Sequence, residues 1–597
     1  MKFQSFFLGV LLASCSLCFI SAAWADSPQA PTANWTMYNK PRASFTLVAH
    51  RGAGDLAPEN CLSSLIYSWG LGCVPEVDVR QTSDGHIVMF HDGDFKRVAP
   101  DAPKELLDKK ISDLTYEQVM SVDIGVARGE QFKGEHVVSI EEIAAALKED
   151  NRRHVVIDVK QVDLQALAEA IYDVRFQCTL TTSDEDLLAR WADICPNADG
   201  TLWMGLGVMN DEQLEARFQT LREKNFRGIN RFHLHVTREE DGTTKPTPEF
   251  IRSHGDELRR RGIEFQAMPW PTKTCPNAKT DYDLFRTLLD LGAMGFGADR
   301  MDIALKALDD FYADAPDDWN IVENIPLDEV VIMGHRGLGN EAPEGTIQTF
   351  IKAWNQGICP EADVRTTKDG VIVSFHDDNF ARILKDAPQE IKNKGVKDCT
   401  LEELRELKVG AYMGEQYADE RIVTLAEIVE ELKKDPKRLI FCDLKNIDLQ
   451  QFARETQDVH PQICLTDPDY NALVEWKKIA PRSKTLIWTP TTWSGTPEDL
   501  EERFNRLRDV NFDALDFVQV HVTVDVQGNV KPGVDVLRRC ANATRRHGVV
   551  FEVITWTNGD KEKSYQVLLD AGVASFATDF PTKTQESVAK YYQSHAK

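Results

Sequence analysis

Basic residues are scarce in this chain of 597 residues. Lysine and arginine together number 69, against 95 aspartates and glutamates, which gives a formal net charge of −26. Nucleic-acid-binding proteins usually present a basic surface, so this charge argues against a nucleic-acid partner. It also disfavours tight docking on an anionic membrane surface. A negatively charged substrate would therefore need a local positive centre, such as a metal ion, a lysine or an arginine.

Long hydrophobic runs are missing beyond the N-terminus, so we expect no stable membrane span. The run at 6–20 follows Lys2 and precedes Ala23-Trp24-Ala25, which fits the cleavage site of a secretory signal peptide. We expect residues 1–25 to be a signal peptide that directs export, to the periplasm or out of the cell. An alternative stays open, because the sequence ending at Cys15 resembles a lipobox and would place a lipid anchor on that cysteine.

Closely spaced cysteine pairs are also missing from the exported part. Of the twelve cysteines, Cys15 and Cys18 lie in the signal segment, and none of the other ten shows the Cys-x-x-Cys spacing typical of structural zinc sites. No glycine-rich fingerprint follows the first predicted strand, which argues against a dinucleotide-binding, doubly wound sheet. The chemistry is therefore expected to rest on other residue types.

A long internal repeat organises what is present. The segment Val48-Ala49-His50-Arg51-Gly52 returns as Met333-Gly334-His335-Arg336-Gly337, an offset of 285 positions (335 − 50). A period this long exceeds that of solenoid repeats and indicates duplication of a whole domain. We predict domains at 44–308 and 327–597, joined by a polar, acidic linker at 309–326. The same offset relates Glu76 to Glu361, His91 to His376, Asp158 to Asp443 and Trp203 to Trp488.

Short apolar or β-branched runs alternate with helix-like stretches in each half. This alternation is typical of a parallel α/β sheet. A half of about 270 residues with charged residues at successive strand ends favours a (β/α)8 barrel, or TIM barrel, over a doubly wound sheet. We therefore predict an α/β protein of two tandem TIM barrels. In the first half we expect strands at 46–49, 75–79, 87–90, 155–159 and 202–205, and helices at 61–70 and 139–149.

Acidic residues occupy the strand ends where a barrel places its active site. Glu76 and Asp78 share one face of a strand, because strand side chains alternate. Asp158 lies on a later strand beside Lys160. Three carboxylates that converge in a barrel mouth repel one another, and a divalent cation that prefers oxygen ligands, Mg²⁺ or Ca²⁺, would relieve this. A salt-bridge network with Arg80 and Lys160 is the structural alternative. Because the set returns as Glu361, Asp363 and Asp443, we expect one divalent metal ion per barrel.

Histidines accompany the acids in both halves. Each pair can serve as general base and general acid near neutral pH, although a structural, hydrogen-bonded role is the alternative for a single histidine. Arginine and lysine side chains beside them can hold phosphate oxygens. The candidates are His50, His91, His335 and His376 for catalysis, and Arg51, Lys160, Arg336 and Lys445 for phosphate. Trp270 and Trp556 are candidates for stacking on a glycerol or sugar-like group, with a core role as the alternative.

In this order, the motifs resemble the glycerophosphodiester phosphodiesterase family. The matching pieces are His-Arg-Gly at 50–52, Pro-Glu-Asn at 58–60, Glu-x-Asp at 76–78, His-Asp at 91–92 and Asp-x-Lys at 158–160. The resemblance implies a TIM barrel with a small insertion after the His-Asp strand, here 95–138 and 380–423. It also implies a divalent metal ion on the three acids of each barrel. The implied reaction has two steps: a glycerol hydroxyl attacks phosphorus, and water then opens the cyclic phosphate to give glycerol 3-phosphate and an alcohol.

Several positions depart from the family pattern. The third metal acid is Asp in both halves, where Glu is usual, and Gly345 stands where the first half has Asn60. The first half has Trp270-Pro271 where the second has Trp556-Thr557-Asn558, and Ala298-Asp299-Arg300 where the second has Thr578-Asp579-Phe580. Two alternatives stay open: a related phospholipase or lyase acting on lipid headgroup diesters, or one catalytic barrel beside a non-catalytic scaffold.

Overall fold

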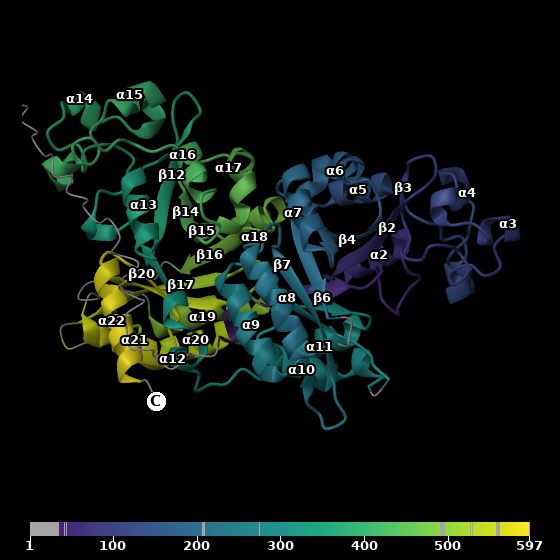
Figure 1. Cartoon of the computed structure of the whole chain (residues 1–597). Coiled ribbons are helices and arrows are strands. Elements are labelled where there is room, and N and C mark those ends of the chain that lie inside the picture. Colours follow the sequence, from purple (N-terminus) through teal and green to yellow (C-terminus); the bar gives the residue numbers. More distant parts are fainter. Residues whose placement is uncertain are drawn as a thin grey trace, which may run out of the picture.

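Each half of the chain forms a closed barrel of eight parallel strands surrounded by helices (Figure 1). The structure is a computed structural model, and it describes residues 35–595 except 41, 43–44, 206–208, 274, 490–495, 526, 528 and 557–560. The prediction of two tandem (β/α)8 barrels is confirmed. Within each barrel the strand ends that carry the charged residues all point to one mouth, as in other TIM barrels.

The first barrel closes because β1 pairs in parallel with both β2 and β10. Its strands are β1 (Thr46–Ala49), β2 (Val74–Gln81), β4 (Val155–Gln161), β5 (Cys178–Thr182), β6 (Asp199–Met204), β7 (Arg231–Arg238), β9 (Glu264–Pro269) and β10 (Gly295–Ala298). Its outer helices are α2 (Leu62–Gly70), α5 (Ile140–Glu149), α6 (Leu164–Ile171), α7 (Glu185–Ile194), α8 (Asp211–Glu223), α9 (Pro248–Arg260), α10 (Tyr282–Asp290) and α11 (Met301–Ala313).

The second barrel repeats this order and closes through β11, which pairs with β12 and β20. Its strands are β11 (Val331–Gly334), β12 (Cys359–Thr366), β14 (Ile440–Leu444), β15 (Ile463–Asp467), β16 (Lys484–Thr489), β17 (Phe517–Val524), β19 (Val550–Trp556) and β20 (Ser575–Thr578). Its outer helices are α13 (Ile347–Asn355), α16 (Leu425–Leu432), α17 (Leu449–Thr456), α18 (Tyr470–Ile479), α19 (Pro497–Asp509), α20 (Val534–Arg545), α21 (Glu562–Asp570) and α22 (Pro581–Ser594).

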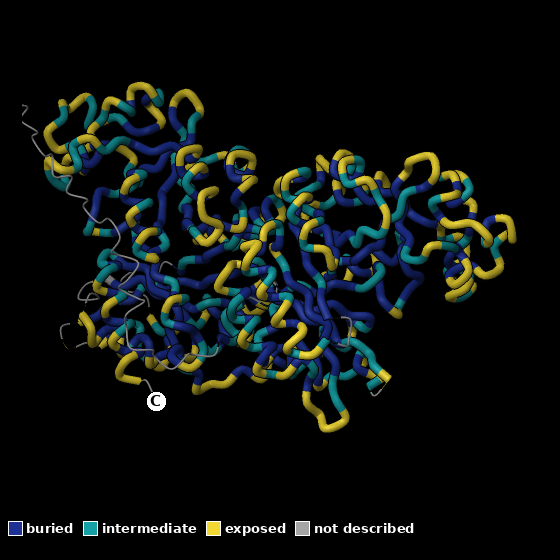
Figure 2. The backbone as a smooth tube through the Cα atoms, viewed as in Figure 1, coloured by how far each residue is buried: buried dark blue, intermediate teal, exposed yellow. Residues whose placement is uncertain are grey.

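Helix α5 illustrates how the local sequence sets these elements. Its first turn is a capping box, in which Ser139 Oγ accepts from Glu142 N at 3.2 Å and Glu142 Oε2 accepts from Ser139 N at 2.8 Å. Helix α16, at the equivalent place, begins with the same device. Buried residues at helical spacing then turn one face to the strands: Ile140, Ile143 and Leu147. Figure 2 shows the resulting buried strands at the centre of each barrel.

The small insertion is present in both barrels. β3 (Ile87–Met89), the strand that precedes His91, runs antiparallel to β2 and stands outside the barrel. The residues after it fold over their own small core, which includes Phe90 and Phe95. The remaining elements are α3 (Lys104–Leu107) and α4 (Tyr116–Met120), their counterparts β13 (Ile372–Ser374), α14 (Gln389–Lys392) and α15 (Leu401–Arg405), and the hairpin strands β8 (Thr244–Lys245) and β18 (Val530–Lys531).

The two barrels meet through the N-terminal ends of their strands. Arg482, just before β16, pairs with Asp199, the first residue of β6, at 3.3 Å. The backbone of Arg42, before β1, donates to the carbonyl of His547, before β19, at 3.2 Å. Active sites lie at the opposite, C-terminal ends in this fold. The two mouths therefore face away from each other, and Figure 1 shows the insertions near α4 and α14 far apart.

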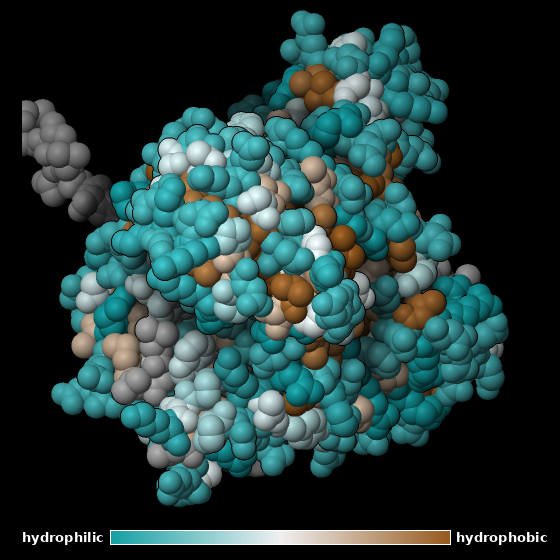
Figure 3. Space-filling model, turned by 90° about the vertical axis from the view of Figure 1, so that its right-hand side faces the viewer, coloured by the Kyte–Doolittle hydropathy of each residue, from teal (hydrophilic) through white to brown (hydrophobic). Residues whose placement is uncertain are grey.

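The stretch predicted as a linker, 309–326, begins within α11 and contains the short helix α12 (Ile321–Asn324). The predicted signal peptide, 1–25, with Cys15, lies outside the described residues. In the part of the chain that the structure describes, no helix is both long and apolar enough to cross a membrane. The face shown in Figure 3 is mostly hydrophilic, and its hydrophobic residues lie in small groups.

Candidate active sites

Three carboxylates meet at the mouth of the first barrel. Glu76 and Asp78 on β2 and Asp158 on β4 have oxygens that all lie within 4.8 Å of one another. The first two side chains are buried, and Asp158 is half-buried. The pairing of Asp78 with Asp158 in the parallel ladder places the acids of the two strands side by side. This set could hold a metal ion, and oxygen ligands of this kind suit a hard divalent cation.

Lys160 neutralises part of the negative charge of these carboxylates. Its Nζ lies 2.7 Å from Asp158 Oδ2 and 3.0 Å from Asp78 Oδ1. Arg80 instead donates to the carbonyl oxygen of His91, at 2.8 Å, so the predicted salt-bridge alternative forms through the lysine alone. Burial, followed by repulsion from Asp78 and Asp158, raises the pKa of Glu76 well above its ordinary value. The neighbouring positive charge is therefore too small to favour the ionised form of Glu76.

His50 follows β1 and is oriented by an aspartate from the last strand of the barrel. Its Nδ1 lies 2.7 Å from Oδ1 of Asp299, which follows β10. Lys279 forms an ion pair with the other oxygen of Asp299. Burial alone would raise the pKa of Asp299, but the hydrogen bond and charge of His50, together with Lys279, lower it to about 2. Asp299 is therefore ionised and accepts the Nδ1 proton of His50, which leaves Nε2 free to exchange a proton.

His91 is held by a second set of charged residues. Its Nδ1 lies 2.7 Å from Asp92 Oδ1, and its Nε2 lies 2.8 Å from Arg51 Nη2. Arg97 links Asp92 to Glu59. It donates to Asp92 Oδ2 at 2.6 Å and to both oxygens of buried Glu59 at 2.6 and 2.9 Å. Since Arg51 also reaches Glu59, the network fixes the arginine and His91 relative to each other.

The backbone of Arg51 adopts a conformation that is rare for residues other than glycine. Its φ is +53°, and that of its counterpart Arg336 is +54°. The left-handed region costs an L-residue about 1–2 kcal/mol. Here it turns the backbone N–H of Arg51 toward Glu76 Oε2, at 2.7 Å, while the side chain reaches His91. Such strain, repeated at equivalent positions, is typical of functional sites.

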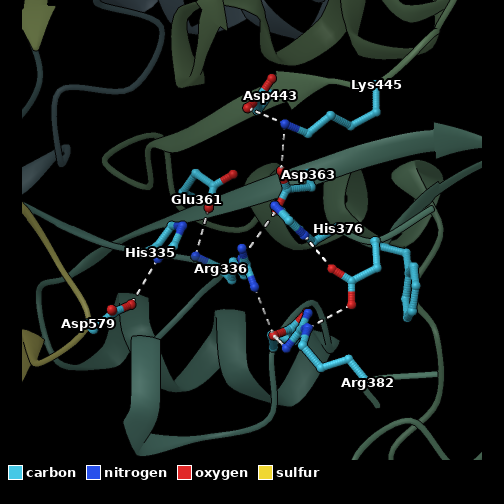
Figure 4. A network of polar contacts seen from close by, with 12 residues as sticks. His335, Arg336, Glu361, Asp363, His376, Arg382, Asp443, Lys445 and Asp579 are labelled. Atoms are coloured by element: carbon cyan, nitrogen blue, oxygen red, sulfur yellow. Dashed lines mark hydrogen bonds and ion pairs between the residues drawn. The ribbon is translucent and has the colours of Figure 1, made fainter. Parts of the chain in front are cut away.

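The second barrel repeats this arrangement, as Figure 4 shows. His335 Nδ1 lies 2.8 Å from Asp579 Oδ1, and His376 Nδ1 lies 2.6 Å from Asp377 Oδ1. Lys445 Nζ lies 2.6 Å from Asp443 Oδ2 and 3.2 Å from Asp363 Oδ1. The remaining counterparts are Glu361, which accepts from the backbone of Arg336 at 2.7 Å, and the pair Arg382 and Glu344.

The replacement of Asn60 by Gly345 has a conformational reason. Both residues have positive φ, +55° and +63°, which asparagine and glycine tolerate best. Asn60 uses its side chain to donate to Asp78 Oδ2 at 3.2 Å and to accept from Asp78 N at 3.0 Å. The second barrel lacks these two bonds, and the guanidinium of Arg336 lies 3.9 Å from Asp363 instead. The backbone is therefore preserved, whereas the support of one acid differs.

Each mouth opens into a cavity inside its barrel, of about 170 Å³ in the first and about 160 Å³ in the second. The first is lined by His50, Arg51, Glu76, His91, Asp158, Lys160 and Trp270 among others, so these candidates are brought together. The second is lined by His335, Glu361, Asp363, His376, Asp443 and Lys445. Asp78 and Arg336 lie next to these cavities, because Asp78 bonds to Lys160 and Arg336 bonds to Glu361, and these partners line them. The side chain of Trp556 lies outside the described part of the chain.

Two functional features were not predicted from the sequence. One is the role of Asp299 and Asp579, which orient the first histidine of each pair, and the other is the pair of Arg97 with Glu59. For the latter a signal existed, since Arg382 and Glu344 follow at the same 285-residue offset (382 − 97 and 344 − 59). For Asp299 the signal was weaker: the offset to Asp579 has changed to 280 (579 − 299), and different residues follow.

Comparisons with known proteins agree with this constellation. The model of the glycerophosphoryl diester phosphodiesterase family matches residues 50–192 and 335–583, together well over half of the chain. A glycerophosphodiester phosphodiesterase of Caldanaerobacter subterraneus subsp. tengcongensis is 38% identical over 120 residues, which cover 20% of this chain and 46% of that protein. One of Arabidopsis thaliana is 30% identical over 196 residues, 31% of this chain and 56% of that protein. The chain thus spans about half the length of these curated relatives.

Solved structures give similar matches. A phosphodiesterase of Oleispira antarctica, in complex with the product sn-glycerol-3-phosphate, is 22% identical. The match covers 43% of this chain and 96% of that one, with a TM-score of 0.33. The family match, by contrast, falls on both barrels and starts in each at the histidine that follows the first strand. The chain therefore belongs to the glycerophosphoryl diester phosphodiesterase family.

Proposed function

We propose that each barrel hydrolyses glycerophosphodiesters to glycerol 3-phosphate and an alcohol. One observation carries this proposal: each barrel mouth gathers two histidines, both supported by aspartates, around three acids and a lysine. Relatives named glycerophosphodiester phosphodiesterase support the same substrate class. A glycerophosphodiester is a small molecule, and cavities of about 170 and 160 Å³ that open at the barrel mouths can take one arm of it.

The three acids of each barrel fit a divalent cation, Mg²⁺ or Ca²⁺, one per barrel. All the donors are carboxylate oxygens, which these ions prefer. The pKa of Glu361 is raised by burial and then by Asp363 and Asp443, as that of Glu76 is by its neighbours, so each site lacks positive charge that a bound cation would supply. Glu76, Asp78 and Asp158 would hold the ion in the first barrel. A bound ion would supply positive charge that stabilises negative charge on the phosphate oxygens.

The histidines would move the protons. Nδ1 of His50 is bonded to Asp299 and Nδ1 of His91 to Asp92, so each ring would exchange its proton through Nε2. Nε2 of His91 accepts from Arg51 and would become available once a phosphate oxygen takes its place as the partner of Arg51. In the first step one histidine removes the proton from a glycerol hydroxyl, which attacks phosphorus, while the other donates a proton to the departing alcohol. In the second step the roles reverse: water gives up a proton, attacks the cyclic phosphate, and the glycerol oxygen regains a proton.

Arg51 and Lys160 would position the phosphate. Arg51 is held by Glu59 and His91 beside the cavity, and its guanidinium can bond two phosphate oxygens at once. Lys160 lines the same cavity and contributes a point charge. Their positive charge supplies the local attraction that an anionic substrate needs against the net charge of −26.

We further propose that the protein is exported through a signal peptide at 1–25, to the periplasm or the medium. A lipid anchor on Cys15 is the competing outcome. Mass spectrometry of the mature N-terminus distinguishes them, because cleavage after Ala25 leaves Asp26 unmodified, whereas a lipoprotein begins with acylated Cys15.

Product analysis tests the proposed reaction. The purified chain is incubated with glycerophosphocholine, with Mg²⁺ or Ca²⁺ and after removal of metal by a chelator. We expect glycerol 3-phosphate and choline in equal amounts, loss of turnover after chelation and recovery when the ion is restored. A cyclic phosphate as the sole phosphorus product would support the lyase alternative and overturn the hydrolase. Turnover that survives complete metal removal would overturn the metal-dependent mechanism.

A further inference from the structure

The inner part of the first cavity carries polar atoms that have no partner. Thr201 Oγ1, His233 Nε2 and His235 Nδ1 are buried and make no hydrogen bond. All three residues line the cavity, and their exposed fractions are only 2%, 9% and 7%. Buried polar side chains are almost always hydrogen-bonded in native proteins, so three such atoms around one cavity indicate a place prepared for a ligand.

The chemistry of these atoms favours hydroxyl groups over a second anion. Burial, together with the nearby charge of His50, lowers the pKa of His233 to about 4, and burial also lowers the pKa of His235 well below its ordinary value. Both rings are therefore neutral at physiological pH. A neutral imidazole has one donor and one acceptor, and a threonine hydroxyl has both. Hydroxyl groups, which also donate and accept, match this set.

An aromatic wall continues the cavity toward the mouth. The ring of His235 stacks between Trp270, at a centroid distance of 4.3 Å and an interplanar angle of 11°, and Trp203, at 5.8 Å. Flat aromatic faces suit the carbon skeleton of a small polyol, whose hydroxyl groups can then reach Thr201 and His233.

The second barrel has different chemistry at the same depth. Leu486 replaces Thr201, Ile554 replaces Met268, and Gln519 replaces His233. Gln519 is satisfied within the barrel, since it donates to Glu552 Oε1 at 2.7 Å while Ser575 donates to Glu552 Oε2 at 2.6 Å. Among the described residues that line this cavity, none has a buried side-chain polar atom without a partner.

A neighbouring glycine shows that the difference is built into the strands. A Cβ added to Gly297 on β10 would lie 2.3 Å from Cε1 of His233, so the histidine fits only against a residue without a side chain. The equivalent residue on β20 is Ala577, which pairs with Ile554 in the ladder. Gly297 and His233 therefore form a matched pair that the second barrel does not contain.

We propose that the first barrel holds the hydroxyl groups of the glycerol arm through Thr201, His233 and His235, and that the second barrel binds the glycerol arm without these contacts and therefore more weakly. The two barrels would then differ in their affinity for the same diesters. This inference rests on the proposed function of both barrels, but it concerns ligand binding and can be tested without turnover.

Calorimetric titration of the full chain, loaded with Mg²⁺ or Ca²⁺, provides the test. The probes are sn-glycerol 3-phosphate and methyl phosphate, which differ in their hydroxyl groups and are not diesters. We expect glycerol 3-phosphate to occupy one tight site and one weaker site per chain. The tight site should bind it at least ten-fold more tightly than methyl phosphate. Thr201→Val should abolish the tight class, and Thr201→Ser, which keeps the hydroxyl, should retain it. Leu486→Val, a matched change in the second barrel, should also retain it.

Three outcomes would overturn the inference: two equal classes for glycerol 3-phosphate, no preference over methyl phosphate, or equal affinities in Thr201→Val and Thr201→Ser. His233→Gln, which copies the second barrel, provides a further variant if Thr201→Val unfolds, as judged by circular dichroism, and should weaken the tight site at least ten-fold. Hydrolysis of glycerophosphocholine is measured on the same preparations. A tight site without any turnover would overturn the proposed function alone, and turnover without a tight site would overturn the inference alone.

Discussion

Asp299 accepts a hydrogen bond from His50 at 2.7 Å, although 249 residues separate them in the chain. The same relationship joins Asp579 to His335 at 2.8 Å. The closure of each barrel brings them together, because the first and last strands pair in parallel. The aspartate fixes the tautomer and the orientation of the histidine, as a buried carboxylate does in other histidine-dependent enzymes.

The variant Asp299→Asn should impair catalysis by the first barrel without unfolding it. Asparagine keeps the size of the side chain but no longer fixes the Nδ1–H tautomer of His50, so we expect kcat to fall by about 10²–10⁴-fold. The measurement is glycerophosphocholine hydrolysis in a chain that also carries His376→Ala, so that only the first barrel contributes. Asp302→Asn, an exposed ion-pair partner of Arg300 on α11, serves as the control. Equal losses in the two variants would contradict a specific role for Asp299.

Metal stoichiometry should follow the two acidic sets. We expect the metal-free chain to bind two divalent ions. The variants Asp78→Asn and Asp363→Asn should each bind one, because asparagine has the shape of aspartate but lacks its charge. The double variant should bind none. Calorimetric titration with Mg²⁺ and Ca²⁺, checked by elemental analysis, gives the numbers. Two ions retained by the double variant would place the metal sites elsewhere.

Glu552 should make the stability of the second barrel depend on pH. Burial raises the pKa of this side chain to about 7 from an ordinary value of 4.5. Because the folded state holds the proton more tightly, its contribution to folding is fully present below pH 4.5 and is lost as the pH rises through about 7. The loss amounts to about 3 kcal/mol.

The variant Glu552→Gln removes this dependence and copies Gln266, the residue at the equivalent place in the first barrel. We expect thermal unfolding of the variant and the wild type to differ little at pH 4.5 and to separate increasingly toward pH 8, with the variant more stable. Differential scanning calorimetry across this range is the measurement. A difference in Tm that is independent of pH would show that Glu552 does not titrate as its burial requires.

The repeat in the sequence made the barrels and the core of each site predictable. Because the offset of 285 residues holds from His50 to Trp203, it aligns the acids, histidines and lysines of both halves without any knowledge of their contacts. Strand patterning was partly successful in the same region: β1 covers the expected residues 46–49 and β4 begins at Val155 as expected, whereas β6 begins at Asp199, before the expected 202–205, and β5 was not predicted.

Long-range partners were harder to predict. Asp299 depends on barrel closure, which no local pattern encodes, and the offset of its counterpart has shifted to 280 (579 − 299). The antiparallel direction of β3 had a local signal, since Asp84-Gly85 is a typical hairpin turn between β2 and β3. The unpaired atoms of Thr201 and His233 could not be foreseen, because hydrogen-bond satisfaction depends on every neighbour in the folded barrel.

The most direct test of two hydrolytic sites is the release of glycerol 3-phosphate by chains carrying His91→Ala, His376→Ala or both. Low and saturating concentrations of glycerophosphocholine should be compared, since the barrels are expected to differ in affinity for the glycerol arm. We predict that each single variant keeps the activity of its intact barrel, whereas the double variant loses at least 99% of the wild-type rate, in line with the loss of a proton-transferring group. Substantial hydrolysis by the double variant would contradict the assignment of catalysis to these histidines.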